Sequence, residues 1–137
     1  MACIIAIEGG AVCVGTPGSY ESDDERAADE ADFYELADEL NKDRYFNNLK
    51  AKAAKDGFEL KPHVSDGDDG CWLVISVGRE ILPDRYMMKG EVKTLSTELS
   101  EEDKANVVKH LTAVENHLRD MGHGTEQQLG IVLNHFD

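Results

Sequence analysis

Residues 21–40 read ESDDERAADEADFYELADEL, and this stretch decides whether the chain folds as an α+β domain or carries an acidic tail. Ser22 and Glu25 are three residues apart, which is the spacing of a capping box at a helix start. Apolar residues then recur at the spacings of one helix face: Phe33, Leu36, Ala37 and Leu40. Because the cap and the apolar stripe agree, we predict a helix over 23–40 with one buried side.

Strands and a second helix are expected on either side of this helix. In CIIAIEGGAVCV, residues 3–14, the Gly9-Gly10 pair is typical of a two-residue hairpin turn, which predicts two short strands. A second helical stretch covers 43–55 and either continues the first helix through a kink or follows a break. Residues 58–64 alternate apolar and polar positions, and Pro62 favours an edge strand because proline has no N–H for a sheet ladder.

The middle of the chain predicts a loop followed by more strands. SDGDDG, residues 65–70, has the composition of a solvated loop. CWLVISV, residues 71–77, is typical of a buried strand. Residues 79–95 then predict one or two further strands, with a turn at Gly78-Arg79 or at Pro83-Asp84.

A second capped helix and an ambiguous tail complete the chain. Ser100 and Asp103 predict the helix start, and Gly122 predicts its end. The last stretch, TEQQLGIVLNHF at 125–136, fits a helix or a strand; we favour a strand because Gly130 is unfavourable within a helix.

The order of these elements predicts the fold class. A strand or hairpin, a helix, two strands, a helix and a strand match a ferredoxin-like βαββαβ sandwich with an extra hairpin, in one α+β domain spanning 1–137. This fold carries enzymes, metal chaperones, sensors and nucleic-acid binders alike, so the fold does not define a function.

Charge and cysteine content narrow the classes of partner. The 137 residues carry a net charge of −14, which argues against direct binding to nucleic acids or anionic membranes and favours a basic protein partner. No apolar run is long enough to cross a bilayer. Cys3, Cys13 and Cys71 are odd in number and form no CxxC pair, so we expect free thiols in a cytoplasmic protein. We expect no cofactor.

Motifs for metal or phosphate chemistry fail on their spacing. Counted from Asp66, an EF-hand would need Gly at its sixth position and Glu at its twelfth, where the chain has Cys71 and Val77. The GTPGS stretch at 15–19 lacks the lysine of a phosphate-binding loop. We therefore predict no metal or phosphate site at these positions.

The histidines give weak candidates for catalysis. His110 and His117 are seven residues apart on one predicted helix, too far to share a metal ion, and we expect both to be partly buried and hydrogen-bonded. His123 lies between two glycines in a predicted loop; with Glu8 and Tyr86 it forms the set of candidate polar groups for an active site.

The acidic helix carries the candidate interaction surface. Residues 21–40 hold ten Asp or Glu and one Arg, a net charge of −9, and several like charges at helical spacing repel each other. At 100° per residue, four acids fall opposite the apolar stripe, beside Tyr34 as an aromatic anchor: Asp24, Glu35, Asp38 and Glu39. Residues 42–61 hold six Lys or Arg against three acids, so the two stretches could instead pair within the fold or between subunits.

Three classes of function remain. The first is a small acidic interaction or inhibitor protein that binds a basic, nucleic-acid-binding protein, as viral anti-defence proteins do; here the analogy is one of charge only. The second is an enzyme or ligand-binding domain with its site in a sheet cleft or at a subunit interface. The third is an assembly subunit, a homo-oligomer built through a sheet edge.

Overall fold

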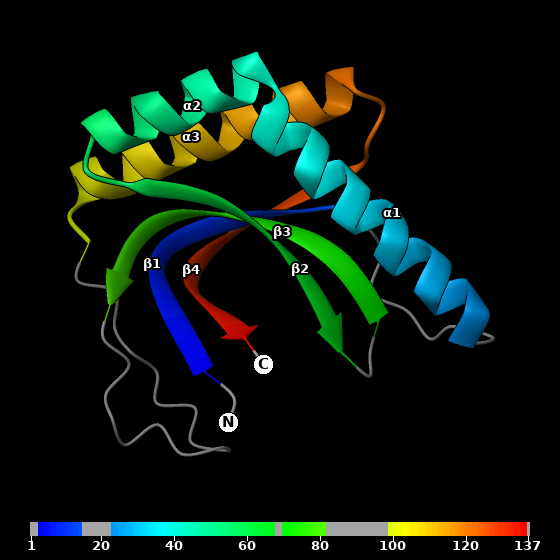
Figure 1. The fold of residues 1–137 in the computed structure, drawn as a ribbon. Coiled ribbons are helices and arrows are strands. Elements are labelled where there is room, and N and C mark those ends of the chain that lie inside the picture. Colours follow the sequence, from blue (N-terminus) through cyan, green and yellow to red (C-terminus); the bar gives the residue numbers. More distant parts are fainter. Residues whose placement is uncertain (1–2, 15–22, 68–69, 82–98, 137) are drawn as a thin grey trace.

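The computed structural model describes residues 3–14, 23–67, 70–81 and 99–136. Within them it describes the side chains of 7–14, 31–64, 73–80 and 99–130. The elements in these residues follow one another as β1 (Cys3–Val14), α1 (Asp23–Lys42), α2 (Arg44–Lys55), β2 (Glu59–Gly67), β3 (Gly70–Ile81), α3 (Glu101–Asp120) and β4 (Thr125–Phe136). The helices lie together on one side of the sheet (Figure 1), so the predicted α+β class is confirmed.

The strands form one antiparallel sheet in the order β2-β3-β1-β4. This order makes β2 an edge strand, as Pro62 predicts, and makes β4 the other edge. The tail at 125–136 is a strand, as we favoured. None of the helices in the described residues is long and apolar enough to cross a membrane.

The hairpin predicted at Gly9-Gly10 is wrong. β1 runs through both glycines without turning, and Gly9 pairs with Gly78 on one side and with Gly130 on the other. A Cβ atom added at Gly9 would lie 2.1 Å from the carbonyl oxygen of Val77, so the glycines serve a close approach of two strands rather than a turn.

Two further turns are also placed differently from the prediction. Gly78-Arg79 is not a turn, because β3 continues to Ile81. Most of the predicted loop at 65–70 is strand: β2 and β3 stay paired as far as Gly67 and Gly70. Pro83-Asp84 and the rest of 82–98 lie outside the described residues.

The sheet is strongly curved. Figure 1 shows β1 and β4 bending away from the helices toward the two chain ends. On the concave side, where no described helix lies, several side chains are nevertheless buried: Ile7, Ala11, Val74 and Ser76. A row of glycines crosses β3, β1 and β4 at Gly78, Gly9 and Gly130. Cβ atoms at Gly78 and Gly9 would collide with main-chain atoms of the neighbouring strand, whereas the space around Gly130 is open, so the first two glycines permit the close approach of β3 and β1.

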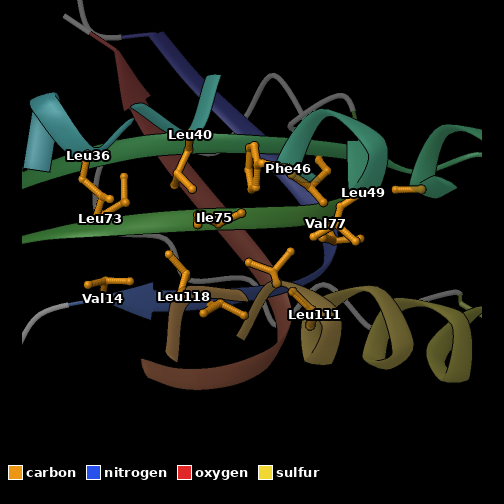
Figure 2. Packing of buried hydrophobic residues seen from close by; sticks show 14 of the residues in the cluster. Val14, Leu36, Leu40, Phe46, Leu49, Leu73, Ile75, Val77, Leu111 and Leu118 are labelled. Carbon is orange, nitrogen blue, oxygen red and sulfur yellow. The ribbon is translucent and has the colours of Figure 1, made fainter. Parts of the chain in front are cut away.

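The hydrophobic core fills the space between the helices and the convex side of the sheet (Figure 2). Its fully buried residues come from β1, β3 and all three helices; they include Val12, Leu40, Phe46, Leu73, Ile75, Val77, Leu111 and Leu118. α1 packs over β2 and β3, whereas α3 packs over β1 and β4. The two helices therefore cover opposite halves of the sheet.

The stretch 23–55 is two helices, separated by a break. Asp43 caps the start of α2, where its carboxylate accepts a hydrogen bond from the main-chain N–H of Tyr45 at 3.3 Å. The break lets α1 bury Leu36 and Leu40 while α2 buries Phe46 and Leu49 at a different angle, visible in Figure 1.

Candidate functional site

The acidic surface of α1 is open to solvent over the part whose side chains are described, residues 31–42. Leu36 and Leu40 point into the core, and the acids lie on the other side of the helix. Its exposed carboxylates are Asp32, Glu35, Asp38 and Glu39, which we call the acidic face. Tyr34 lies beside them with 53% of its surface exposed. Asp24 belongs to α1, but its side chain lies outside the described ones.

The acidic face has no ion-pair partner among the described side chains. α2 packs against α1 and carries only basic charges: Arg44, Lys50, Lys52 and Lys55. None of these forms an ion pair with the described part of α1; Lys50 instead donates to the amide oxygen of Asn41 at 3.0 Å. The described residues therefore give no support to neutralisation of α1 by 42–61 within the fold, and such pairing between subunits stays a prediction.

Two histidines of α3 hold the two ends of α2. Nε2 of His110 lies 2.7 Å from Oδ2 of Asp56, the residue that caps the end of α2, and His110 is only 5% exposed. Nε2 of His117 bonds Oδ2 of Asp43, the residue that caps the start of α2. The prediction of partly buried, hydrogen-bonded histidines is confirmed, and these contacts give both histidines a structural role.

Tyr45 extends this arrangement to the surface. Its ring lies 4.6 Å from the His117 ring, centroid to centroid, and it stays 52% exposed. Burial works to raise the pKa of Asp43, but the hydrogen bonds from His117 and the Tyr45 amide, with the charge on His117, outweigh it and lower that pKa. Sequence reasoning missed both Asp–His pairs, because their partners are 54 and 74 residues apart.

The candidate catalytic residues do not come together. Glu8 lies opposite Arg79 on β3, and no described group hydrogen-bonds its buried Oε1. Arg79 turns instead to Asp103 in the first turn of α3, at 3.3 Å, which places Glu8 near that end of the helix. His123 follows the other end of α3, roughly 30 Å away for a helix of 20 residues. Tyr86 lies outside the described residues.

The described side chains line two hollows. One, of about 530 Å³, adjoins His123 and is lined by Val14, Phe33 and residues 122–126. The other, of about 270 Å³, lies between β4 and the start of α3 and is lined by Gly9, Leu99, Lys104, Val107, Leu129 and Gly130. Leu129 is 60% exposed there. No group of three or more metal-ligating side chains occurs in the described part of the chain.

Buried polar groups elsewhere join α3 to the sheet. Glu115 is 8% exposed and accepts a hydrogen bond from the Thr125 hydroxyl at 2.8 Å and another from Arg119 at 3.4 Å. Cys13 on β1 is a half-buried free thiol whose pKa is raised by burial and by the nearby charge of Glu126. Neither group faces the acidic surface of α1.

No protein-family model matches this chain, and comparisons with curated proteins and with solved structures found no match. The fold and its surfaces define a small α+β protein with an acidic helical face.

Proposed function

We propose that this chain is an acidic interaction protein that binds a basic, nucleic-acid-binding protein through the acidic face of α1. The observation that supports this most is the isolation of the acidic face: its carboxylates are exposed and find no cation among the described side chains, although a basic helix packs beside them. A surface that served only solvation would gain from such pairs, and here they are absent from the described residues.

The arrangement of charges on α1 costs stability in the free protein. Glu35 lies three residues from Asp32 and Asp38 and four from Glu39, so it faces like charges on both sides. Each such pair costs a few tenths of a kcal/mol in an isolated helix. Cations of a bound partner would relieve this repulsion, and Tyr34 would add an apolar contact with aromatic or guanidinium groups.

The fold suits a rigid presentation of this helix. We infer a ferredoxin-like arrangement, because α1 and α2 connect β1 to β2, α3 connects β3 to β4, and the strand order is β2-β3-β1-β4. The buried side of α1 is held by the sheet, so its acids are displayed on a preorganised surface. The cysteine pattern and the free thiol of Cys13 support a cytoplasmic location.

The test compares two variants of equal charge. The first replaces Asp32→Asn, Glu35→Gln, Asp38→Asn and Glu39→Gln, the four carboxylates of the acidic face. The control replaces four acids away from α1: Glu59→Gln, Glu80→Gln, Glu102→Gln and Asp120→Asn. Each variant changes the net charge from −14 to −10, since four negative charges are removed. The first variant should be as stable as the parent, or slightly more stable, because it loses internal repulsion.

Binding is then measured with proteins retained from a lysate by the parent chain, purified and tested one at a time. We expect the α1 variant to bind at least ~10-fold more weakly, mainly through a slower association rate, while the control keeps its affinity. Binding by the parent should weaken steeply between about 50 and 500 mM NaCl. Equal losses in the two variants, or no loss in either, would refute a role for the acidic face.

A further inference from the structure

The two edges of the sheet differ in how they are protected. β2 carries Pro62 and Lys61, both of which discourage pairing with another strand. β4 has 12 residues and contains no Pro, Lys or Arg. Its ladder to β1 covers its full length on one side, and among the described strands nothing pairs with the other side. The backbone of β4 therefore offers a long open edge for hydrogen bonding.

An apolar hollow lies next to this edge. Leu129 projects toward the helix side of the sheet, opposite Gly10, which has no side chain to cover it. Leu99 and Val107 line the same hollow of about 270 Å³. An exposed leucine in a strand beside a hollow of apolar side chains is typical of a surface that becomes covered on association.

We propose that β4 pairs antiparallel with β4 of a second copy of this chain, about a two-fold axis near Leu129, to make one continuous sheet. This register sets Leu129 against its counterpart and aligns residues 125–133 of both copies. It would form roughly eight to ten main-chain hydrogen bonds, two for each hydrogen-bonded pair. On the helix side, the aligned positions of β4 with described side chains are uncharged: Thr125, Gln127 and Leu129.

The near absence of charged side chains on β4 makes this edge the place where a second copy can bind despite the negative charge of the chain. A chain of net charge −14 repels itself, so self-association needs an interface that avoids acidic side chains. β4 has one acid, Glu126, on the opposite face of the sheet. In the proposed register the two Glu126 residues are six positions apart along the strands, roughly 20 Å. A basic partner would find little to bind here, whereas α1 offers it a row of acids.

The experiment measures the mass of the full-length protein in solution by sedimentation velocity and light scattering over a range of concentrations. The parent chain should reversibly form dimers. Leu129→Lys places two like charges at the two-fold axis and should weaken the dimer roughly 10-fold or more. Asn48→Lys adds the same charge at an exposed site on α2 and should leave the dimer unchanged. Leu129→Ser tests the contact without a charge, and circular dichroism verifies that each variant folds.

Salt separates this proposal from the proposed function. The dimer should hold or strengthen as NaCl rises, because salt screens the repulsion between two acidic chains, whereas binding through the acidic face should weaken. A parent chain that stays monomeric up to about 0.5 mM would overturn the β4 proposal. So would a dimer that persists unchanged in both Leu129 variants, since another surface would then hold it. Neither result bears on the acidic face.

Discussion

The contact between His110 and Asp56 makes a measurable prediction about how α2 is held on the fold. We expect His110→Ala to lower the free energy of unfolding by about 1.5–3 kcal/mol. The imidazole is 5% exposed and lies 2.7 Å from the carboxylate of Asp56. A hydrogen bond to a charged group contributes about 1.5–3 kcal/mol. The Asp56 side chain is 36% exposed, so solvent screening reduces the share due to this pair to about 1–2 kcal/mol.

The remaining loss should come from packing. The ring of Phe58 meets the His110 ring edge-on with centroids 6.3 Å apart, a contact worth about 0.5–1 kcal/mol. For a domain of this size, a loss of about 1.5–3 kcal/mol corresponds to a decrease in Tm of roughly 5–10 °C. The distinction between the hydrogen bond and the packing needs a double-mutant cycle.

The cycle compares urea unfolding at pH 7 of four proteins: the parent, His110→Ala, Asp56→Ala and the double variant. We expect the double variant to be more stable than the sum of the single losses predicts, by about 1–2 kcal/mol, because the pair can be lost only once. Losses that add within about 0.3 kcal/mol would show that the two side chains do not stabilise one another. The conclusion that Asp–His pairs fix α2 on α3 would then be wrong.

Three further predictions concern the glycine row, the thiol of Cys13 and the loss of stability at low pH. Gly78→Ala should destabilise the fold by about 2 kcal/mol or more, because the added Cβ atom would lie 2.2 Å from a main-chain oxygen of β1. Gly124→Ala should be nearly neutral, because the space around Gly124 is open. Urea unfolding of the two variants compares these effects. Cys13 should react slowly with a thiol reagent at pH 8, since burial and then Glu126 raise its pKa, and Glu126→Gln should speed the reaction; equal rates would contradict the charge effect. Burial works to raise the pKa of Asp43, but hydrogen bonds from an imidazole and a main-chain amide outweigh burial and lower this pKa. The Asp43 carboxylate should therefore stabilise the fold at pH values above 3.8, the ordinary pKa of an aspartate, and this stabilisation should be lost as the pH falls below 3.8. The stability gap between the parent and Asp43→Asn should therefore close in acid titrations toward pH ~2.

The helices could be predicted from the sequence because their signals are local. Cap residues and apolar spacing lie within one or two turns, and α1 and α3 begin and end close to where these signals place them. The sequence around Asp43 could not show whether the first helix continues through a kink or ends at a break, because the role of Asp43 as a helix cap depends on how α2 packs. The edge position of β2 could also be predicted locally, because the missing N–H of Pro62 is tolerated only at a sheet edge or a bulge.

The glycines misled the prediction because their meaning is not local. Gly9-Gly10 suits a hairpin turn by composition, yet its function is to let β1 approach β3 closely at Gly78, 69 positions further along the chain. A sequence shows that a backbone position needs no Cβ atom, but only the paired strands show why. The same limit explains why the apolar hollow beside Leu129 was missed, since α3 and β4 form it together.

The candidate site residues likewise fall into those that local sequence could predict and those that depend on the topology. Exposure of Glu35, Asp38 and Glu39 follows from helix geometry alone, and the structure places them on the solvent side of α1. Glu8 and His123 share no spacing in the sequence that would place them in one site. Their separation by the length of α3 is a property of the topology, and no periodicity in the sequence contains it.

The two proposed surfaces are compatible because they lie on opposite halves of the sheet. α1 packs over β2 and β3, and the open edge of β4 lies beyond β1, under α3. Pairing through β4 would therefore leave the acidic face of each copy free. A dimer of this kind carries two acidic faces, so a basic partner with two matching sites would bind it by avidity without any new contact.

The net charge of −14 has two opposing consequences for these two surfaces. It strengthens encounter with a basic partner and weakens self-association, and both effects decline as salt rises. At low ionic strength a basic partner that neutralises α1 would also reduce the repulsion between copies, so partner binding would strengthen dimerisation. Linkage then requires that dimerisation raise the affinity for the partner by the same factor.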